Sequence, residues 1–357
     1  MDKFANQPDR DRQAVLQEAA ARRGDINPII LEKDFWVCWT LKRLVENTAL
    51  APHITFKGGT SLSKAYGLIN RFSEDIDLTI SRDAPYLSKG EDPMDDTISN
   101  KERERRIDAL KENAQLFVTK IALPHLETDI RTEFGEKKEW KIVPDPEDKD
   151  QQTLLFYYPR VFNYTRGLNF SNFSFNKKNF ATTEYIKPHI KLEFGARGET
   201  TPSHPQKISP YIAQDFPGLF TVHDLQVPTL DVERSFWEKV TILHALYHGM
   251  NMRDRMSRHY YDTYQMSEAG IAKAALGKID LLEQVVRNKS LMFRDAKASY
   301  GTAKVGSIKL VPEPEAQARL KQDYKAMEEM FMGKYPDFDT VIKGLVELEK
   351  LINETMT

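Results

Sequence analysis

Two aspartates, Asp75 and Asp77, lie one residue apart in a short apolar segment and are the side chains best suited to chemistry. In a β-strand alternate side chains share a face, so the two carboxylates would project together while Ile76 and Leu78 point the other way. Neighbouring carboxylates repel each other unless a cation lies between them, and hard divalent cations prefer oxygen ligands. The pair therefore predicts a site for Mg²⁺ or Mn²⁺.

A glycine turn precedes the aspartates, in residues 56–64 (FKGGTSLSK). Glycine allows backbone N–H groups to approach a phosphate closely, and a helix that starts there adds its dipole. A phosphate cradle beside a two-carboxylate metal site predicts nucleotidyl transfer. Lys64 either reaches the phosphates or lies on the exposed side of the helix. The residues expected to form the cradle are Gly58, Gly59, Thr60 and Ser61.

A third carboxylate is expected, because a second metal that activates the attacking hydroxyl needs further ligands. Residues 185–194 read as a strand with Glu193 on its polar face. The alternative is a solvent-facing pair of Lys191 and Glu193, such as edge strands often carry. Glu184 and Asp129 remain further possibilities for the third acid.

Two charged residues in the second half of the chain are candidates for the same site. Lys239 has the apolar neighbours Phe236 and Leu243 at helical spacing. A lysine on an apolar stripe either extends to solvent or faces an anion such as a phosphate, since burial without one is costly. Asp262 either pairs with Arg258 at the (i, i+4) spacing or faces the active site.

A compact basic run in a loop between two expected helices is a candidate contact for a nucleic-acid backbone. Lys137, Lys138, Lys177 and Lys178 are weaker candidates of the same kind. The members of the run are Arg253, Arg255 and Arg258.

Ser73 lies two residues before Asp75. A phosphate on this serine would place roughly two negative charges beside the metal-binding acids. We therefore expect phosphorylation of Ser73 to inhibit the enzyme.

The order of expected elements predicts an α/β (α+β) fold in two parts. Residues 1–225 would form a nucleotidyltransferase domain with a small, mixed, twisted sheet, and helices in residues 9–47 would pack on it. Residues 226–357 would form a helical bundle that closes over the cleft. A hairpin or insertion is expected at residues 163–180. The glycine turn and the acids fall in a strand–turn–helix–strand unit that spans residues 53–80.

The composition predicts a cytoplasmic protein. The 357 residues are 40% hydrophobic and 29% charged, with a formal net charge of −2, so any nucleic-acid contact must be local. The single cysteine, Cys38, excludes an internal disulfide and fits a reducing compartment. We expect neither a signal peptide nor a membrane-spanning segment.

At these motifs the chain resembles the AbiEii/AbiGii toxin family, a branch of the DNA polymerase β-like nucleotidyltransferases that includes the MenT-type toxins. The resemblance covers nearly the whole chain, and the block from the glycine turn to the two aspartates is its most specific part. The segments that carry it are residues 30–37 (ILEKDFWV), 56–64 (FKGGTSLSK), 71–78 (RFSEDIDL) and 306–312 (GSIKLVP), with Lys191-Leu192, Lys239 and Tyr261-Asp262.

The resemblance implies a polymerase β-like fold and a toxin from a bacterial toxin–antitoxin or abortive-infection (phage defence) operon, with an AbiEi-like antitoxin as partner. It implies transfer of a nucleoside monophosphate from an NTP, in the MenT-type branch to the 3′ end of tRNA, which would block translation. By the same resemblance Gly59 and Ser61 belong to the phosphate-binding motif, Asp75 and Asp77 to the metal pair, Lys191 to the second motif, Lys239 to the third and Asp262 to the fourth.

Two alternative functions use the same residues. The enzyme could transfer the nucleotide to a small molecule or to a protein. A different class is a non-catalytic NTP-binding module that acts through a partner protein.

Overall fold

The computed structural model describes residues 1–24, 26–162, 186–220 and 225–355. The insertion expected at residues 163–180 therefore lies outside the described residues. The strands are β1 (Ile54–Lys57), β2 (Ile76–Ile80), β3 (Lys141–Pro144), β4 (Thr153–Tyr157), β5 (Ile190–Gly195), β6 (Ser203–Ile208) and β7 (Leu225–Leu230). The α-helices are α1 (Asp2–Ala5), α2 (Asp9–Arg22), α3 (Pro28–Glu46), α4 (Gly58–Lys64), α5 (Asn100–Phe117), α6 (Leu123–Phe134), α7 (Ile212–Asp215), α8 (Val232–Tyr247), α9 (Ser257–Glu268), α10 (Ile271–Leu276), α11 (Ile279–Met292), α12 (Pro314–Ala326) and α13 (Phe338–Glu354).

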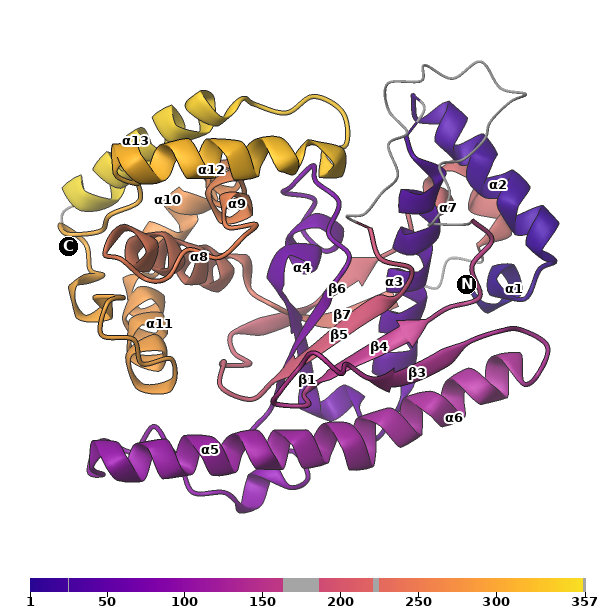
Figure 1. Ribbon diagram of the computed structural model, residues 1–357, viewed down its shortest axis with the longest axis horizontal. Coiled ribbons are helices and arrows are strands. Elements are labelled where there is room, and N and C mark those ends of the chain that lie inside the picture. Colours follow the sequence, from indigo (N-terminus) through magenta and orange to yellow (C-terminus); the bar gives the residue numbers. More distant parts are fainter. Residues whose placement is uncertain (25, 163–185, 221–224, 356–357) are drawn as a thin grey trace.

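The seven strands form one mixed sheet in the order β3-β4-β5-β2-β1-β7-β6 (Figure 1). β2 pairs with β1 in antiparallel and with β5 in parallel orientation. The predicted fold class, a mixed sheet with a C-terminal group of helices, is confirmed. The sheet is larger than expected, because β6 and β7 were not predicted. β7 pairs with β1 and β6, so the sheet continues to Leu230, and the domain boundary at residue 225 stays a prediction.

One face of the sheet is apolar and carries the main core. Ile76 and Leu78 of β2 and Leu192 of β5 are buried in a cluster with residues of α3, α5 and α6. Trp36 and Trp39 of α3 are fully buried in this cluster. In Figure 1 the rod formed by α5 and α6 runs along one side of the sheet. The opposite face is left to the polar residues that alternate with these apolar ones.

The rod of α5 and α6 is a single helical run joined by a π-helical segment, Val118–Ala122. Pro124 follows the π-helical segment at the start of α6. Proline has no N–H to donate and its ring displaces the carbonyl one turn earlier. A widened turn accommodates this proline without ending the helix.

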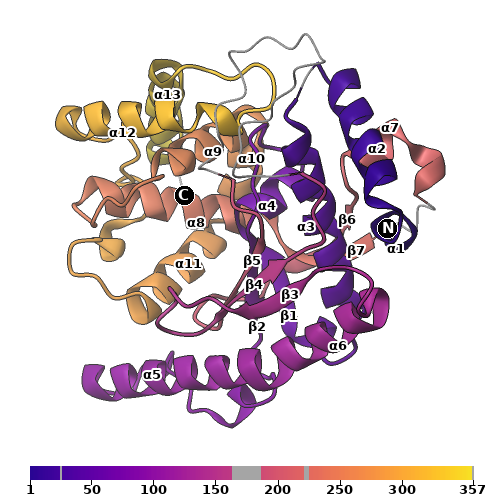
Figure 2. The same cartoon turned by 45° about the vertical axis from the view of Figure 1, so that its right-hand side comes forward.

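The helices α8 to α13 enclose a second core beside the sheet (Figures 1 and 2). Leu62 of α4 and Ile69 belong to this second cluster. α4 therefore lies between the sheet and the C-terminal helices. No described helix combines the length and apolar character needed to cross a bilayer.

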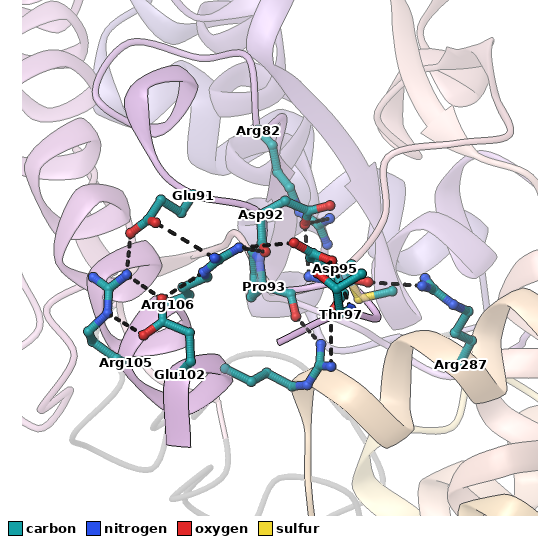
Figure 3. Close-up of polar contacts among 12 residues, drawn as sticks. Arg82, Glu91, Asp92, Pro93, Asp95, Thr97, Glu102, Arg105, Arg106 and Arg287 are labelled. Carbon is teal, nitrogen blue, oxygen red and sulfur yellow. Dashed lines mark hydrogen bonds and ion pairs between the residues drawn. The ribbon is translucent and has the colours of Figure 1, made fainter. Parts of the chain in front are cut away.

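A polar network ties the loop after β2 to α11 (Figure 3). Arg287 donates to Asp96 Oδ2 at 2.8 Å and to the carbonyl of Met94 at 2.9 Å. Arg82 reaches Glu199 at 2.9 Å. The contacts of Arg287 join the sheet-containing part to the C-terminal helices at a second place, away from α4, whereas Arg82 and Glu199 both belong to the sheet-containing part.

α3 carries three consecutive charged residues that are all buried: Glu32, Lys33 and Asp34. Each has a partner from a distant part of the chain, as buried charges require. Glu32 Oε1 accepts from Val161 N at 2.6 Å. Lys33 Nζ donates to Glu74 Oε2 at 2.6 Å and to the carbonyl of Lys187 at 2.7 Å. Asp34 accepts from Lys64 Nζ and from Tyr211 N, at 2.6 Å each. The charged residues in the motif at 30–37 thus have a structural role, because they bind α3 to distant segments of the chain.

We expect Glu32→Gln to flatten the pH dependence of stability. Burial raises the pKa of Glu32 from 4.5 to about 7. Because the folded state then binds the proton more tightly than the unfolded chain, this group lowers the free energy of unfolding as pH rises from 4.5 to about 7. As pH rises between those limits, the free energy of unfolding of the variant should therefore increase by about 3 kcal/mol relative to that of the wild type.

Urea denaturation at pH 5 to 8 measures this difference. Glu347→Gln, at an exposed position of α13, is the control and should show no pH-dependent change relative to wild type. A wild type and a Glu32→Gln variant with parallel pH profiles would contradict the assignment.

Candidate active site

The glycine turn lies directly against Asp77. Gly58 follows β1 with φ of +79°, and a Cβ atom there would lie 1.9 Å from Asp77 Oδ2. A Cβ at Gly59 would lie 2.7 Å from a guanidinium nitrogen of Arg71 and 2.9 Å from Ser73 Oγ. Both positions therefore require glycine, the first for its conformation and for close approach, the second for close approach alone.

The two hydroxyl residues after the glycines hold the turn in place. Thr60 Oγ1 lies 2.9 Å from Ser73 Oγ and also donates to the carbonyl of Asp75. Ser61 Oγ donates to the carbonyl of Gly58 at 2.8 Å. Both side chains are buried. These bonds fix the turn to the segment that carries the aspartates.

Asp75 and Asp77 lie close enough to Glu193 for its charge to affect their ionisation. Asp75 immediately precedes β2 and Asp77 is its second residue. Asp77 is aligned with Glu193 of β5 in the parallel register. Burial, Glu193 and Asp75 together raise the pKa of Asp77 to about 7. Burial and Glu193 also raise the pKa of Asp75.

The donor chemistry of these carboxylates fits a divalent metal. Within the described ranges, no three His, Cys, Asp or Glu side chains are gathered closely enough to hold an ion as they stand. Burial and the charge of Glu193 nevertheless raise the pKa of both half-buried aspartates, and Asp75 adds to the rise at Asp77, which is the repulsion that a bound cation relieves. Asp75 and Asp77 would hold the metal, and Glu193 is the nearest further carboxylate on the sheet.

Glu193 and Lys191 form an ion pair at 2.6 Å on the polar face of β5, with their side chains 42% and 34% exposed. This pair is the alternative that the sequence left open, yet Glu193 also faces Asp77 across the strand register. Of the other acids considered, Asp129 on α6 accepts from Asn47 Nδ2 at 2.7 Å. Glu184 lies outside the described residues.

Asp262 joins two cations from the two halves of the chain. Arg71 donates to both of its carboxylate oxygens at 2.7 and 2.8 Å, and Lys239 Nζ donates to Oδ2 at 2.7 Å. The Asp262 side chain has no exposed surface. Although burial raises its pKa, Arg71 and Lys239 outweigh that effect and hold the pKa of Asp262 well below its usual range. Lys239 and Asp262 thus face each other, and Asp262 does not pair with Arg258.

Arg71 is a residue whose role sequence reasoning missed. Its guanidinium lies beside Gly59 and is fixed by Asp262. The only local signal was its place in residues 71–78, where a basic residue precedes the acids. A charge partner 191 positions away along the chain gave no local pattern.

The basic loop is anchored next to the site. The backbone N–H groups of Arg255 and Ser257 donate to Asp323 of α12 at 2.7 and 2.8 Å. Arg253 and Arg255 line a cavity of about 360 Å³ with residues of α12. Arg258 lies one helical turn before Asp262, and its charge opposes the rise in the pKa of Asp77.

Lys64 is engaged by a buried carboxylate. Its ammonium lies 2.6 Å from Asp34 Oδ1 and 3.5 Å from the ring centre of Tyr211, and its side chain is 4% exposed. The sequence pattern allowed a phosphate or solvent as its surroundings. Instead, the fold brings Asp34, which lies 30 residues earlier on α3, close enough to pair with the Lys64 ammonium.

The comparisons with known proteins agree with this class of site. A family model described as "Nucleotidyl transferase AbiEii toxin, Type IV TA system" matches residues 39–344. The match spans most of the 357 residues, so the chain belongs to this family of nucleotidyltransferase toxins of type IV toxin–antitoxin systems. The resemblance noted in the sequence is thereby confirmed.

No curated protein matches the chain. Among solved structures it is similar to MenT4, a nucleotidyltransferase toxin from Mycobacterium tuberculosis H37Rv, with 14% identity and a TM-score of 0.39. That alignment covers 94% of this chain and 98% of the other.

We expect Gly58→Ala to destabilise the protein more than Gly67→Ala. Both glycines have positive φ, but a Cβ at Gly67 meets nothing within 4 Å, whereas at Gly58 it collides with Asp77. Each variant should lose about 1–2 kcal/mol from backbone strain, and Gly58→Ala should lose at least about 1 kcal/mol more from the collision.

Chemical denaturation of both variants measures the difference, with nucleotide transfer assayed in parallel. Gly67→Ala serves as the control for the shared backbone strain and should keep its activity. Equal stability losses, or full transfer by Gly58→Ala, would show that the close approach to Asp77 is not required.

Proposed function

We propose that this protein transfers a nucleoside monophosphate from an NTP to the 3′ end of an RNA, with tRNA as the acceptor that the family resemblance favours. The observation that carries the proposal is the packing of the Gly58–Gly59 turn against Asp77, with two cations beside it. A turn that admits only glycine next to a pair of acids leaves space and charge suited to a metal-bound triphosphate.

The triphosphate would lie between the glycine turn and the cations held by Asp262. Lys239 and Arg71 reach this place from different halves of the chain. A carboxylate and a phosphate oxygen compete for the same donors, so these cations are already oriented for an anion. Asp262 acts as a positioning residue for both. Arg258, on the same helix, faces the same group of charges.

The acceptor hydroxyl would attack the α-phosphorus in line. The new bond joins the hydroxyl oxygen to the α-phosphorus, the bond to the bridging oxygen breaks, and pyrophosphate leaves. Glu193 is the group proposed to receive the hydroxyl proton, because it is partly exposed and faces Asp77. Lys191 keeps the Glu193 side chain on the polar face of β5 at 2.6 Å.

Mg²⁺ or Mn²⁺ held by Asp75 and Asp77, with Glu193 as a further ligand, would neutralise charge on the phosphates and on the attacking and leaving oxygens. The protein itself supplies the fixed acids, the glycine turn and the two cations.

The physiological setting follows from the family. Type IV toxin–antitoxin systems pair a toxin with an antitoxin, so we propose an AbiEi-like antitoxin as the cognate partner and phage defence as the role of the pair. The single cysteine fits a cytoplasmic location.

Two alternatives remain distinguishable. Transfer to a small molecule or a protein would use the same cradle and acids but would proceed without RNA. A non-catalytic module would retain NTP and release no pyrophosphate. The presence of both Asp75 and Asp77 beside the glycine turn favours catalysis, since binding alone does not need two metal-binding acids.

We expect Asp75→Ala/Asp77→Ala to abolish transfer, by at least about 10³-fold, because the metal ligands are lost. The assay incubates purified protein with Mg²⁺, total tRNA and each α-labelled NTP in turn. Glu347→Ala/Glu354→Ala removes two exposed acids of α13 and is the control that should remain active.

Label on tRNA from one NTP, absent with the double variant, would support the proposal. Pyrophosphate release without labelled RNA would move the acceptor to a protein or small molecule. A double variant that is folded by circular dichroism and still transfers label would refute the assignment of the acids.

We expect Ser73→Glu to reduce transfer strongly, as a mimic of phosphorylation, while Ser73→Gln of similar size retains more activity. Ser73 Oγ lies 2.9 Å from Thr60 Oγ1, in the segment just before the aspartates. A negative charge there would compete with the triphosphate for the nearby cations. Equal activities of the two variants, measured by the same labelling assay, would exclude a charge effect.

A further inference from the structure

A groove of about 480 Å³ lies beside the β3–β4 hairpin, outside the site described above. Its walls combine cations with aromatic rings. Lys137, Lys141 and Arg160 are exposed, and none of them forms an ion pair in the described part of the chain. The remaining residues that line it are Asp9, Lys138, Glu139, Trp140, Tyr157, Tyr158, Pro159 and Pro188.

The acids of the groove do not cancel its positive charge. Asp9 already binds Arg12 at 2.8 Å and Lys138 at 3.3 Å. Lys138 and Asp9 pair with each other. The three remaining cations of the groove are therefore opposed only by the carboxylate of Glu139. Exposed cations without partners are the groups that bind a phosphate backbone.

The aromatic part of the groove centres on Tyr157. The ring centres of Tyr157 and His189 are 5.1 Å apart, and Lys141 Nζ lies 4.3 Å from the Tyr157 ring centre. Burial and the nearby Lys33 lower the pKa of His189 to about 4, so its ring is neutral at physiological pH. Aromatic rings beside exposed lysines can stack on bases, and such stacking tolerates any base sequence.

The strand registers connect this groove with the catalytic carboxylates. Lys191 and Glu193 share one face of β5, because Ile190, Leu192 and Phe194 are buried on the other. Glu193 is aligned with Thr153 of β4, and Lys191 with Leu155. Tyr157 continues this face along β4 and is aligned with Lys141 of β3. Thr153 and Leu155 of β4 are buried on this face, whereas Lys191 and Glu193 of β5 are partly exposed. The accessible path from Asp77 to the groove therefore follows β5.

The length of this path suits a short stretch of nucleic acid. Four residues of strand separate His189 from Glu193, which corresponds to about 13 Å. At 3.4 Å or more for each nucleotide, roughly two to four nucleotides would span it.

We infer that the groove and the adjoining face of β5 bind a single-stranded segment of the acceptor RNA next to its reacting end. This inference rests on the proposed function. Lys137, Lys141 and Arg160 contact phosphates, and Tyr157 stacks on a base. Single-stranded RNA suits this surface because stacking on side chains requires unpaired bases.

The test measures binding directly, on the full-length protein. A fluorescein-labelled single-stranded RNA 12-mer is titrated with protein by fluorescence anisotropy at several KCl concentrations. The variant Lys137→Gln/Lys141→Gln/Arg160→Gln should bind at least 10-fold more weakly. Its salt slope should fall by about 2, since each lost contact to single-stranded phosphate removes about 0.7.

Two further variants separate charge from stacking. Lys325→Gln/Lys343→Gln/Lys350→Gln removes the same charge from exposed positions of α12 and α13, and should bind within twofold of wild type. Tyr157→Leu should weaken binding about fivefold or more without changing the salt slope. All variants should keep the wild-type thermal shift with NTP, because the groove is separate from the glycine turn.

Wild-type affinity in the groove variant would overturn the inference while leaving nucleotide transfer intact. Equal affinity for a duplex of the same length would overturn the single-strand assignment. If the wild type transfers no label to RNA but binds the 12-mer through these residues, the proposed reaction fails and the groove assignment stands.

Discussion

The two ion pairs of Asp262 are the interaction on which the active-site geometry depends. They fix Arg71, which follows α4, to Lys239 and Asp262, which lie on α8 and α9. Next to them the chain around Arg71 pairs with a C-terminal segment, through Phe72 N to Met330 O at 2.6 Å and Met332 N to Asn70 O at 2.9 Å. Because all three charged groups are buried, loss of one partner would leave an uncompensated charge, which costs several kcal/mol. The relative position of the two cores is therefore set at the place where the phosphates are proposed to bind.

Charge is distributed unevenly around this point. On the sheet side, burial and the charge of Glu193 raise the pKa of both aspartates. On the helical side, the charge of Arg258 opposes this rise. The protein alone leaves the acids partly uncompensated, since Asp262 occupies Arg71 and Lys239. Addition of a metal to the acids and of a polyanion to the cations would balance both sides, which is the requirement of phosphoryl transfer from a metal-bound nucleotide.

The two faces of the sheet have different roles: one packs against the core helices, and the other carries the charged residues of the proposed site. Alternate residues of β2 and β5 either enter the core with α3, α5 and α6 or join the polar face. Further along the same face, the β3–β4 hairpin adds cations and aromatic rings. A transferase that acts on a polymer must hold it beyond the reacting nucleotide. A face that is continuous from the acids to the groove can do so without another domain.

Local sequence motifs by themselves determined much of this site. The glycine pair, the alternating acids and the apolar surroundings of Lys239 each carry a short-range pattern: a positive φ, a two-residue period, or a helical stripe. These patterns predicted the strand–turn–helix–strand unit, the acids and the family. The start of α3 was also readable, because Asn27 caps it with a bond from Ile29 N to its side chain at 3.0 Å.

Tertiary structure alone decided which charges meet. Lys64 binds Asp34, Lys33 binds Glu74, and Asp262 binds both Arg71 and Lys239. These partners lie 23 to 191 residues apart, and the attraction between charges depends on distance in space, which no sequence spacing records. The strands β7 and β6, at one end of the sheet, escaped prediction for a related reason. Pro205 and Pro228 argue against strands locally, and these segments enter the sheet only because β7 pairs with β1 and β6 pairs with β7.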